Sequence, residues 1–142
     1  MKYEKIDTAI VLVRLIVGPV FLSEGIQKFL FPAVRGAGRF VEIGLPAPEF
    51  LSYFVAVFEI ICGLLIILGL FTRYAAVPLI IIMLVALSTT KVPVLIHDGF
   101  WSMVHAARTD WSMLLGSVFL FRTGPGNISL DAYRAEKADA GG

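Results

Sequence analysis

Apolar residues are concentrated in four stretches of the chain, near residues 8–30, 48–70, 74–96 and 103–122. Each stretch has about 20 residues, the length that an α-helix needs to cross roughly 30 Å of hydrocarbon. The pattern therefore predicts an all-α fold, a four-helix transmembrane bundle. We expect it to be a single domain over residues 1–142.

Helix-breaking residues mark the ends of these stretches. The first ends at "FPAVRGAG", where Pro32 and two glycines interrupt it, and the second begins after "GLPAP", with Pro48 suited to a first helical turn. Only "FTR" separates the second stretch from the third, which predicts a tight antiparallel hairpin. Pro93 lies near the end of the third stretch and is expected to kink it or stop it.

The region around the fourth stretch is the least regular. Residues 97–109 mix aromatic and polar side chains at near-helical spacing, which is compatible with a short interfacial helix before the last crossing, a loop or a lid. The chain leaves the membrane at "GPGNISLD", whose glycines and proline resist helix. The polar tail, residues 127–142, is expected to be frayed.

Composition supports a membrane location in contact with lipid. Apolar residues make up 58% of the chain, charged residues 16%, and the formal net charge is +1 without a basic run. We therefore expect no nucleic-acid partner. Four spans place both termini on one side of the membrane, and that side has six Lys and Arg residues against five on the other, a slight preference for cytoplasmic termini.

The sequence contains no recognisable redox centre of its own. Cys62 is the only cysteine, which excludes an intramolecular disulfide, a CxxC pair and a haem-binding CxxCH, and we expect it to be a small buried apolar residue. His97 and His105 have no close third ligand in the sequence, so we predict no metal site. We expect no intrinsic cofactor.

Charged residues inside the apolar stretches are the strongest functional signal. In the first stretch, Arg14, Gly18, Phe21, Gly25 and Lys28 fall on one helical face. The glycines on this face would let another helix approach closely, as helices in membrane bundles do. This face is therefore predicted to point into the bundle.

The other spans also carry acids on faces that can point inward. Glu59 shares a face with Ser52, Ala56 and Gly63; Asp110 shares one with Leu114, Ser117 and Phe121. At 1.5 Å per residue, Glu59 lies near mid-bilayer, while Glu24, Lys91 and Asp110 lie further from the termini. Together with Lys28, and with Arg108 at the rim, these groups form a predicted charged cluster in the half of the bundle away from the termini.

Arg14 stands apart from this cluster, in the half of the bundle that carries the termini. Its expected partners are Glu59, backbone carbonyls of a neighbouring helix, or lipid phosphate. A charge at the bilayer centre costs at least about 2.5 to 3.5 kcal/mol, so all of these groups must be paired, neutralised or hydrated.

Two interpretations of the cluster stay open at this point. The charges can be ion pairs that hold the helices in register, with Glu24 and Lys28 an i,i+4 pair on one helix. Alternatively, they can line a polar cavity that binds a small amphipathic ligand or relays protons, since intramembrane ionisable residues are functional candidates by default. A partner subunit could also complete such a site.

Several sequence segments, taken in order, resemble the DoxX family of small four-helix membrane proteins. They are Arg14 with "GPVFLSEGIQKF", then "GLPAP", Glu59 with Gly63, "LGLFTR", "RTDWSMLLGSVFLF" and "GPGNISLD". Many family members have His late in the third span and Glu early in the fourth, where this chain has Lys91 and Asp110. Asp110 keeps the acid, but Lys91 cannot serve as a neutral metal-binding imidazole.

The resemblance implies a multi-pass protein of the bacterial or archaeal inner membrane, with some relatives associated with quinone-linked oxidoreductases. We therefore predict a homo-oligomer or a subunit of a membrane redox complex, whose polar pocket binds an isoprenoid quinone headgroup or passes protons. Glu59 and Asp110 would accept hydrogen bonds or protons, and a further set of charged residues would set their charge state: Arg14, Glu24, Lys28 and Lys91. The alternatives are a non-catalytic structural or assembly subunit and an oligomeric transporter of small solutes or protons.

Overall fold

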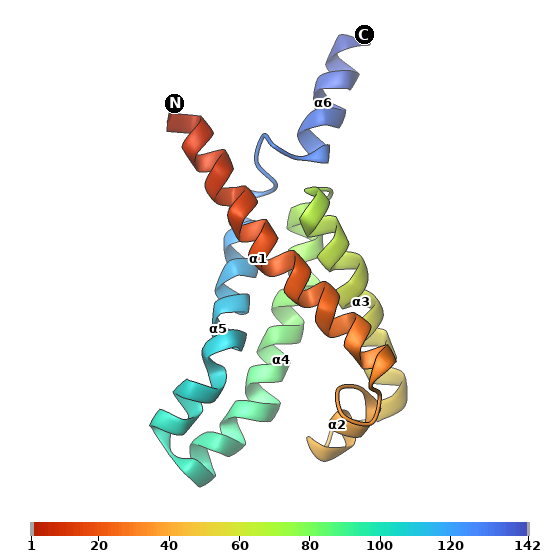
Figure 1. The fold of residues 1–142 in the computed structure, drawn as a ribbon, viewed down its shortest axis with the longest axis vertical. Helices are drawn as coiled ribbons and strands as arrows, with labels where there is room; N and C mark the ends of the chain where they lie inside the picture. Colours follow the sequence, from red (N-terminus) through yellow and green to blue (C-terminus); the bar gives the residue numbers. More distant parts are fainter. Residues whose placement is uncertain (1, 142) are drawn as a thin grey trace.

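A computed structural model describes residues 2–141, which form six α-helices and no strands (Figure 1). The helices are α1 (Lys2–Leu30), α2 (Ala37–Glu42), α3 (Pro48–Leu68), α4 (Thr72–Asp98), α5 (Phe100–Thr123) and α6 (Leu130–Ala140). The prediction of an all-α fold is therefore confirmed. Three of the helices, α1, α3 and α4, are long and apolar enough to cross a membrane. The fourth predicted stretch also forms a helix, α5, which packs along α4.

The four long helices form two pairs, α1 with α3 and α4 with α5 (Figure 1). The α1–α3 pair is close because glycines meet at the crossing: a Cβ added to Gly63 would lie 2.9 Å from the carbonyl oxygen of Gly18. A Cβ on Gly25 would lie 2.7 Å from the carbonyl oxygen of Ala56. The glycine face predicted for the first span is thus the contact between these helices.

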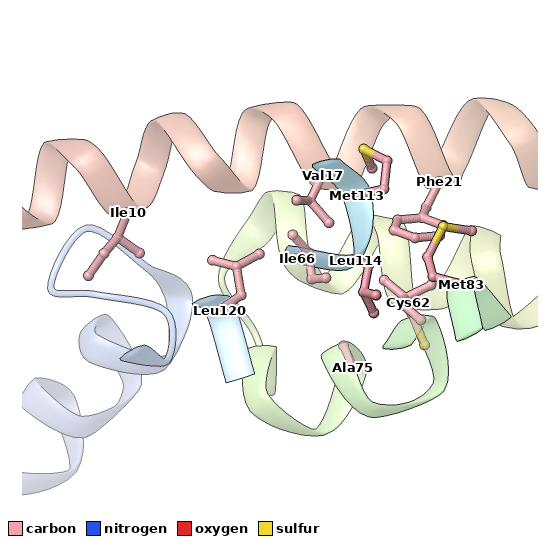
Figure 2. Packing of buried hydrophobic residues seen from close by; sticks show 11 residues of the cluster. Ile10, Val17, Phe21, Cys62, Ile66, Ala75, Met83, Met113, Leu114 and Leu120 are labelled. Carbon is pink, nitrogen blue, oxygen red and sulfur yellow. The ribbon is translucent and has the colours of Figure 1, made fainter. Parts of the chain in front are cut away.

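The apolar core lies in the half of the bundle near the two termini (Figure 2). Val17 and Phe21 of α1 point from one side toward Ile66 of α3 and Leu114 of α5. Along α4, the described residues are buried only as far as Met83. Beyond that point, the remaining half of α4 has no buried residue, so the two helix pairs are less closely packed there than in the core.

Three local predictions differ from the structure. The segment expected only as a break contains the short helix α2, and the tail expected to fray contains helix α6. Ser129 caps α6 by accepting a hydrogen bond from the backbone N–H of Ala132 at 3.2 Å, which is the local reason that this polar segment is helical. Of the two outcomes expected at Pro93, a kink or a stop, the stop does not occur, since α4 continues to Asp98.

Residues 97–109 do not form a separate interfacial helix. The chain turns at Gly99, whose φ of 88° suits a residue without a side chain, and α5 then runs without a break from Phe100 to Thr123. The segment therefore forms the end of α4 and the first turns of α5. Cys62 is buried in the core, as predicted.

Candidate functional site

Arg14 is buried at the end of the bundle that carries the termini, where its guanidinium binds backbone carbonyls. Nε donates to the carbonyl oxygen of Ile66 at 2.9 Å and Nη2 to that of Ile67 at 2.7 Å, both in the last turn of α3. Nη1 donates to the carbonyl oxygens of Pro125 at 3.1 Å and Ile128. Glu59, backbone carbonyls and lipid phosphate were the expected partners of Arg14, and the structure shows backbone carbonyls.

This cluster of carbonyls, which we call the Arg14 clamp, ties three parts of the chain together. The last carbonyls of a helix have no partner within the helix, and the partial negative charge there favours a cation. The planar guanidinium can donate several hydrogen bonds at fixed angles, which suits an array of carbonyls from α3 and from the α5–α6 linker. Arg14 does not contact Glu59, so its expected role in setting the charge of that acid is not supported by the geometry.

Glu59 is paired with Lys28 in the opposite half of the bundle. Lys28 Nζ lies 2.7 Å from Glu59 Oε2, and the two side chains are 10% and 3% exposed. The pair joins α1 to α3. The predicted i,i+4 pair between Glu24 and Lys28 is not formed: Lys28 Nζ lies 3.5 Å from the backbone oxygen of Glu24, while the Glu24 side chain is half-buried. The nearby carboxylate of Glu59 takes the ammonium instead.

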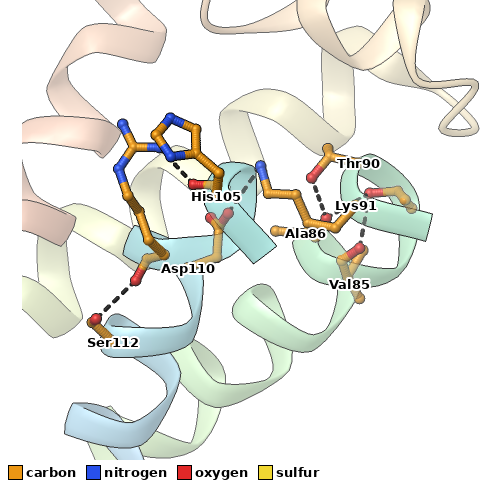
Figure 3. Close-up of polar contacts among 9 residues, drawn as sticks. Val85, Ala86, Thr90, Lys91, His105, Asp110 and Ser112 are labelled. Atoms are coloured by element: carbon orange, nitrogen blue, oxygen red, sulfur yellow. Dashed lines mark hydrogen bonds and ion pairs between the residues drawn. The ribbon is translucent and has the colours of Figure 1, made fainter. Parts of the chain in front are cut away.

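A second ion pair joins α4 to α5. Lys91 Nζ lies 3.0 Å from Asp110 Oδ2, with side-chain exposures of 20% and 23% (Figure 3). On the same side of α4, the hydroxyl of Thr90 donates to the carbonyl oxygen of Ala86 at 2.6 Å. The face of α5 that carries Asp110 was predicted to point inward, and this is only partly confirmed. Leu114 and Ser117 on that face are buried, but Phe121 is 43% exposed.

Both ion pairs line one cavity of about 910 Å³, which we call the polar cavity. It lies between the two helix pairs, beyond the apolar core, and α2 contributes to its wall. Five of the six predicted site residues line it: Glu24, Lys28, Glu59, Lys91 and Asp110. Arg14 does not. The structure therefore brings the predicted charged cluster together and separates Arg14 from it.

The sequence prediction missed the part of the wall supplied by α2 and the segment before it. Arg35, Arg39 and Glu42 line the cavity, and Arg39 Nη1 lies 3.1 Å from Glu42 Oε2. The i,i+3 spacing of Arg39 and Glu42 is a helical signal that was available in the sequence. With these residues, four acids and four bases line the cavity: Glu24, Glu42, Glu59 and Asp110, with Lys28, Arg35, Arg39 and Lys91.

The arrangement can hold a polar group without carrying a net charge of its own. Ammonium and guanidinium groups can donate to carbonyl oxygens, and carboxylates can accept from hydroxyls. Apolar side chains such as Phe21, Met83 and Met113 complete the wall on the core side. A mostly apolar pocket with a few convergent polar groups is the usual form of a small-molecule site. His97 and His105 are exposed and do not line the cavity.

Comparisons with known proteins agree with the sequence resemblance. The chain is 51% identical over 140 residues to "Uncharacterized membrane protein Rv3486" of Mycobacterium tuberculosis, an alignment that covers 94% of this chain and 86% of that protein. It is 32% identical over 123 residues to "Putative oxidoreductase CatD" of Bacillus subtilis, covering 86% of this chain and 84% of that protein. No solved structure matches the chain. The family model for DoxX matches residues 9–98. The chain therefore belongs to the DoxX family of membrane proteins.

Proposed function

We propose that this protein is an accessory subunit of a membrane redox system and that its polar cavity binds the headgroup of an isoprenoid quinone. In this proposal α5 is the fourth membrane span, so that the four long helices form a transmembrane bundle in the inner membrane with both termini in the cytoplasm. The observation that carries the proposal is the convergence of two ion pairs on one cavity of about 910 Å³ between the helix pairs.

The chemistry of a quinone headgroup fits these groups. Its two carbonyl oxygens accept hydrogen bonds, and the ammonium groups of Lys28 and Lys91 line the cavity from different helix pairs. A reduced quinol donates hydrogen bonds instead, and Glu59 and Asp110 offer carboxylate acceptors beside those ammonium groups. The cavity can therefore interact with both redox states, which suits a subunit that holds the quinone while a partner protein exchanges electrons with it.

The name of the relative from Bacillus subtilis, "Putative oxidoreductase CatD", supports the redox part of the proposal. The chain offers no cysteine pair for electron transfer, since Cys62 is its only cysteine. Electrons would come from another subunit or a soluble donor. We therefore place the protein in a redox complex or a homo-oligomer associated with one, with membrane lipid around it.

The test is to identify what the purified protein carries. Organic extracts of the detergent-purified protein are examined by mass spectrometry beside the variants Glu59→Gln and Glu49→Gln. Glu49 lies on the same helix, is exposed and does not line the cavity, so it is the matched control. We expect near-stoichiometric isoprenoid quinone in the parent and in Glu49→Gln, and its loss from Glu59→Gln that is still folded. Lipid alone in all three proteins would contradict the proposal.

A structural role is the second candidate, because each ion pair joins two helices. Lys28–Glu59 links α1 to α3 and Lys91–Asp110 links α4 to α5. If the charges serve only assembly, Glu59→Gln and Asp110→Asn would lower yield and thermal stability first, because each leaves a cation without its partner. Binding of quinone would then be absent in the parent as well as in the variants.

A further inference from the structure

A second cavity, of about 770 Å³, lies between α4 and α5 and is distinct from the polar cavity. We call it the α4–α5 groove. Its wall is apolar except for Ser88, Lys91 and Arg108. The apolar wall is formed by Leu87, Val92, Leu95, Phe100, Met103, Val104, Ala107 and Trp111. Lys91 lines both this groove and the polar cavity.

The charged groups that face the groove are both cations. Arg108 is exposed, and its guanidinium donates to the carbonyl oxygen of His105 on its own helix. Within residues 2–141, no carboxylate pairs with Arg108. Lys91 has a carboxylate partner, Asp110, which lines the polar cavity and not the groove. The groove therefore presents positive charge beside apolar surface, with no acid of its own.

The two cations lie at one level along the hairpin that α4 and α5 form. At 1.5 Å per residue, Lys91 is roughly 28 Å along α4 from Thr72, so a hydrocarbon layer of ~30 Å that began at Thr72 would end near Lys91. Lys91 and Arg108 also lie at similar distances from the turn at Gly99, since α4 and α5 are antiparallel neighbours. Of the apolar wall, Leu87 and Trp111 lie on the side of these cations toward the apolar core, and the other six residues lie on the side toward Gly99.

We propose that the α4–α5 groove binds an anionic phospholipid. Its phosphate contacts Arg108 and Lys91, and one acyl chain lies against Leu87 and Trp111. A guanidinium can bind phosphate oxygens through two parallel hydrogen bonds, and an acyl chain matches the apolar wall. A zwitterionic lipid is the poorer ligand, because its headgroup brings a cation toward Arg108, which has no carboxylate partner within residues 2–141.

The contact with Lys91 predicts a substitution that should increase the affinity for the lipid. The ammonium of Lys91 serves Asp110 on one side and the lipid phosphate on the other, so the two anions compete for it. Asp110→Asn removes the competing charge and keeps the shape of the side chain. Lipid binding should then become tighter, which a general loss of structure could not produce.

The experiment compares two lipids with the same acyl chains, phosphatidylglycerol and phosphatidylcholine, in mixed micelles with the full-length protein. Bound lipid is counted by native mass spectrometry for the parent, Arg108→Gln, Asp110→Asn and Arg122→Gln. Arg122 is the matched control, since it is an exposed arginine of the same helix outside the groove. We expect a preference for phosphatidylglycerol, a loss of about fivefold in Arg108→Gln, a gain in Asp110→Asn and no change in Arg122→Gln.

The proposal has a further steric check and clear contrary results. Ser88 is exposed in the groove, so Ser88→Phe should fill it and weaken binding of both lipids while the helix content by circular dichroism stays at the parent value. Equal binding of the two lipids by the parent would overturn the proposal. So would an equal loss in Arg122→Gln, which would reduce the effect to surface charge, or weaker binding in Asp110→Asn. The comparison of the two lipids in Arg108→Gln and Arg122→Gln does not depend on whether quinone binds, because neither arginine lines the polar cavity.

Discussion

At the end of the bundle that carries the termini, one cation is surrounded by backbone carbonyls, whereas at the opposite end two cations are paired with carboxylates beside a cavity. Arg14 has no acid among its bonded partners; it is held by oxygens of α3 and the α5–α6 linker. Lys28 and Lys91 each have a carboxylate partner and line the polar cavity. The carbonyls at the first end belong to the backbone, so its hydrogen bonds can change only if the backbone moves.

The ion-paired end is different because its charges belong to side chains. A ligand can take hydrogen bonds from a lysine there, or give them to a carboxylate, through movements of side chains alone. The apolar core lies near the clamp and the cavity lies beyond it. The end with the Arg14 clamp therefore holds the helices together, whereas the end with the polar cavity can bind a ligand.

The largest expected effect is that of removing the clamp. Arg14→Met leaves the carbonyls of Ile67, Pro125 and Ile128 without a donor, while that of Ile66 keeps the backbone N–H of Gly69. We expect a loss of about 4 kcal/mol in the free energy of unfolding, given about 1 to 3 kcal/mol for each unsatisfied buried group. Arg14→Lys should recover little, because an ammonium cannot reach the same array. The measurement is the thermal midpoint of the purified protein in detergent. Stability equal to the parent in both variants would refute the clamp.

Breaking the buried ion pair should have a smaller effect that can be reversed. Lys28→Met leaves Glu59 buried without a cation, which costs about 3 kcal/mol. The double variant Lys28→Met with Glu59→Leu should regain most of that stability, because two apolar side chains then meet. It should nevertheless lose quinone. If the double variant were as unstable as Lys28→Met, the ion pair would be as necessary for stability as the Arg14 clamp, which would contradict the difference between the two ends.

The packing of the two regions can be compared by adding one carbon atom to each. Gly63→Ala places a Cβ 2.9 Å from backbone atoms of α1, so the helices must separate, and we expect a loss of about 2 kcal/mol. Val85→Leu adds a carbon atom at an exposed side chain that lines the polar cavity, and should change stability by less than about 0.5 kcal/mol. Chemical denaturation of both variants measures the difference. Equal losses would contradict an open cavity beside Val85.

The smallest effect concerns the linker that follows α5. The Asp7 carboxylate accepts hydrogen bonds from the backbone N–H of Asn127 at 2.9 Å and from its side-chain amide at 3.0 Å. Asp7→Ala should cost less than about 1 kcal/mol overall, because these contacts are exposed. Its visible consequence is faster proteolysis within residues 124–141, while the thermal midpoint barely moves. Protection equal to the parent would contradict a role for Asp7 in holding the linker, which the Arg14 clamp and the hydrogen bonds of Asp131 with Gly69 and Phe71 would then hold without it.

Much of this comparison could be predicted from helical periodicity. A repeat of 3.6 residues places Arg14 and Lys28 on the buried face of α1, and the structure has both buried. The same rule placed Glu59 on the buried face of α3. Periodicity does not fix how far one helix is displaced along another, so it could not show that Lys28 pairs with Glu59 rather than with Glu24.

Other features depend on contacts between distant parts of the sequence. Pro125 and Ile128 are more than a hundred residues from Arg14, and no local pattern connects them. The short helices α2 and α6 were missed because glycines and polar residues dominate their surroundings. For α6, the cap at Ser129 was the available local signal.

The most direct test of the central claim is to locate a bound quinone on the chain. A light-activated azido-quinone is cross-linked to the full-length protein in membranes, with and without excess unlabelled quinone, and the labelled peptides are sequenced. The account predicts labelling of the cavity-lining residues within 81–91 and 109–113, and its loss with competitor and in Glu59→Gln. Labelling that competitor does not reduce, or that falls on the lipid-facing side chains near Arg14, would contradict the account.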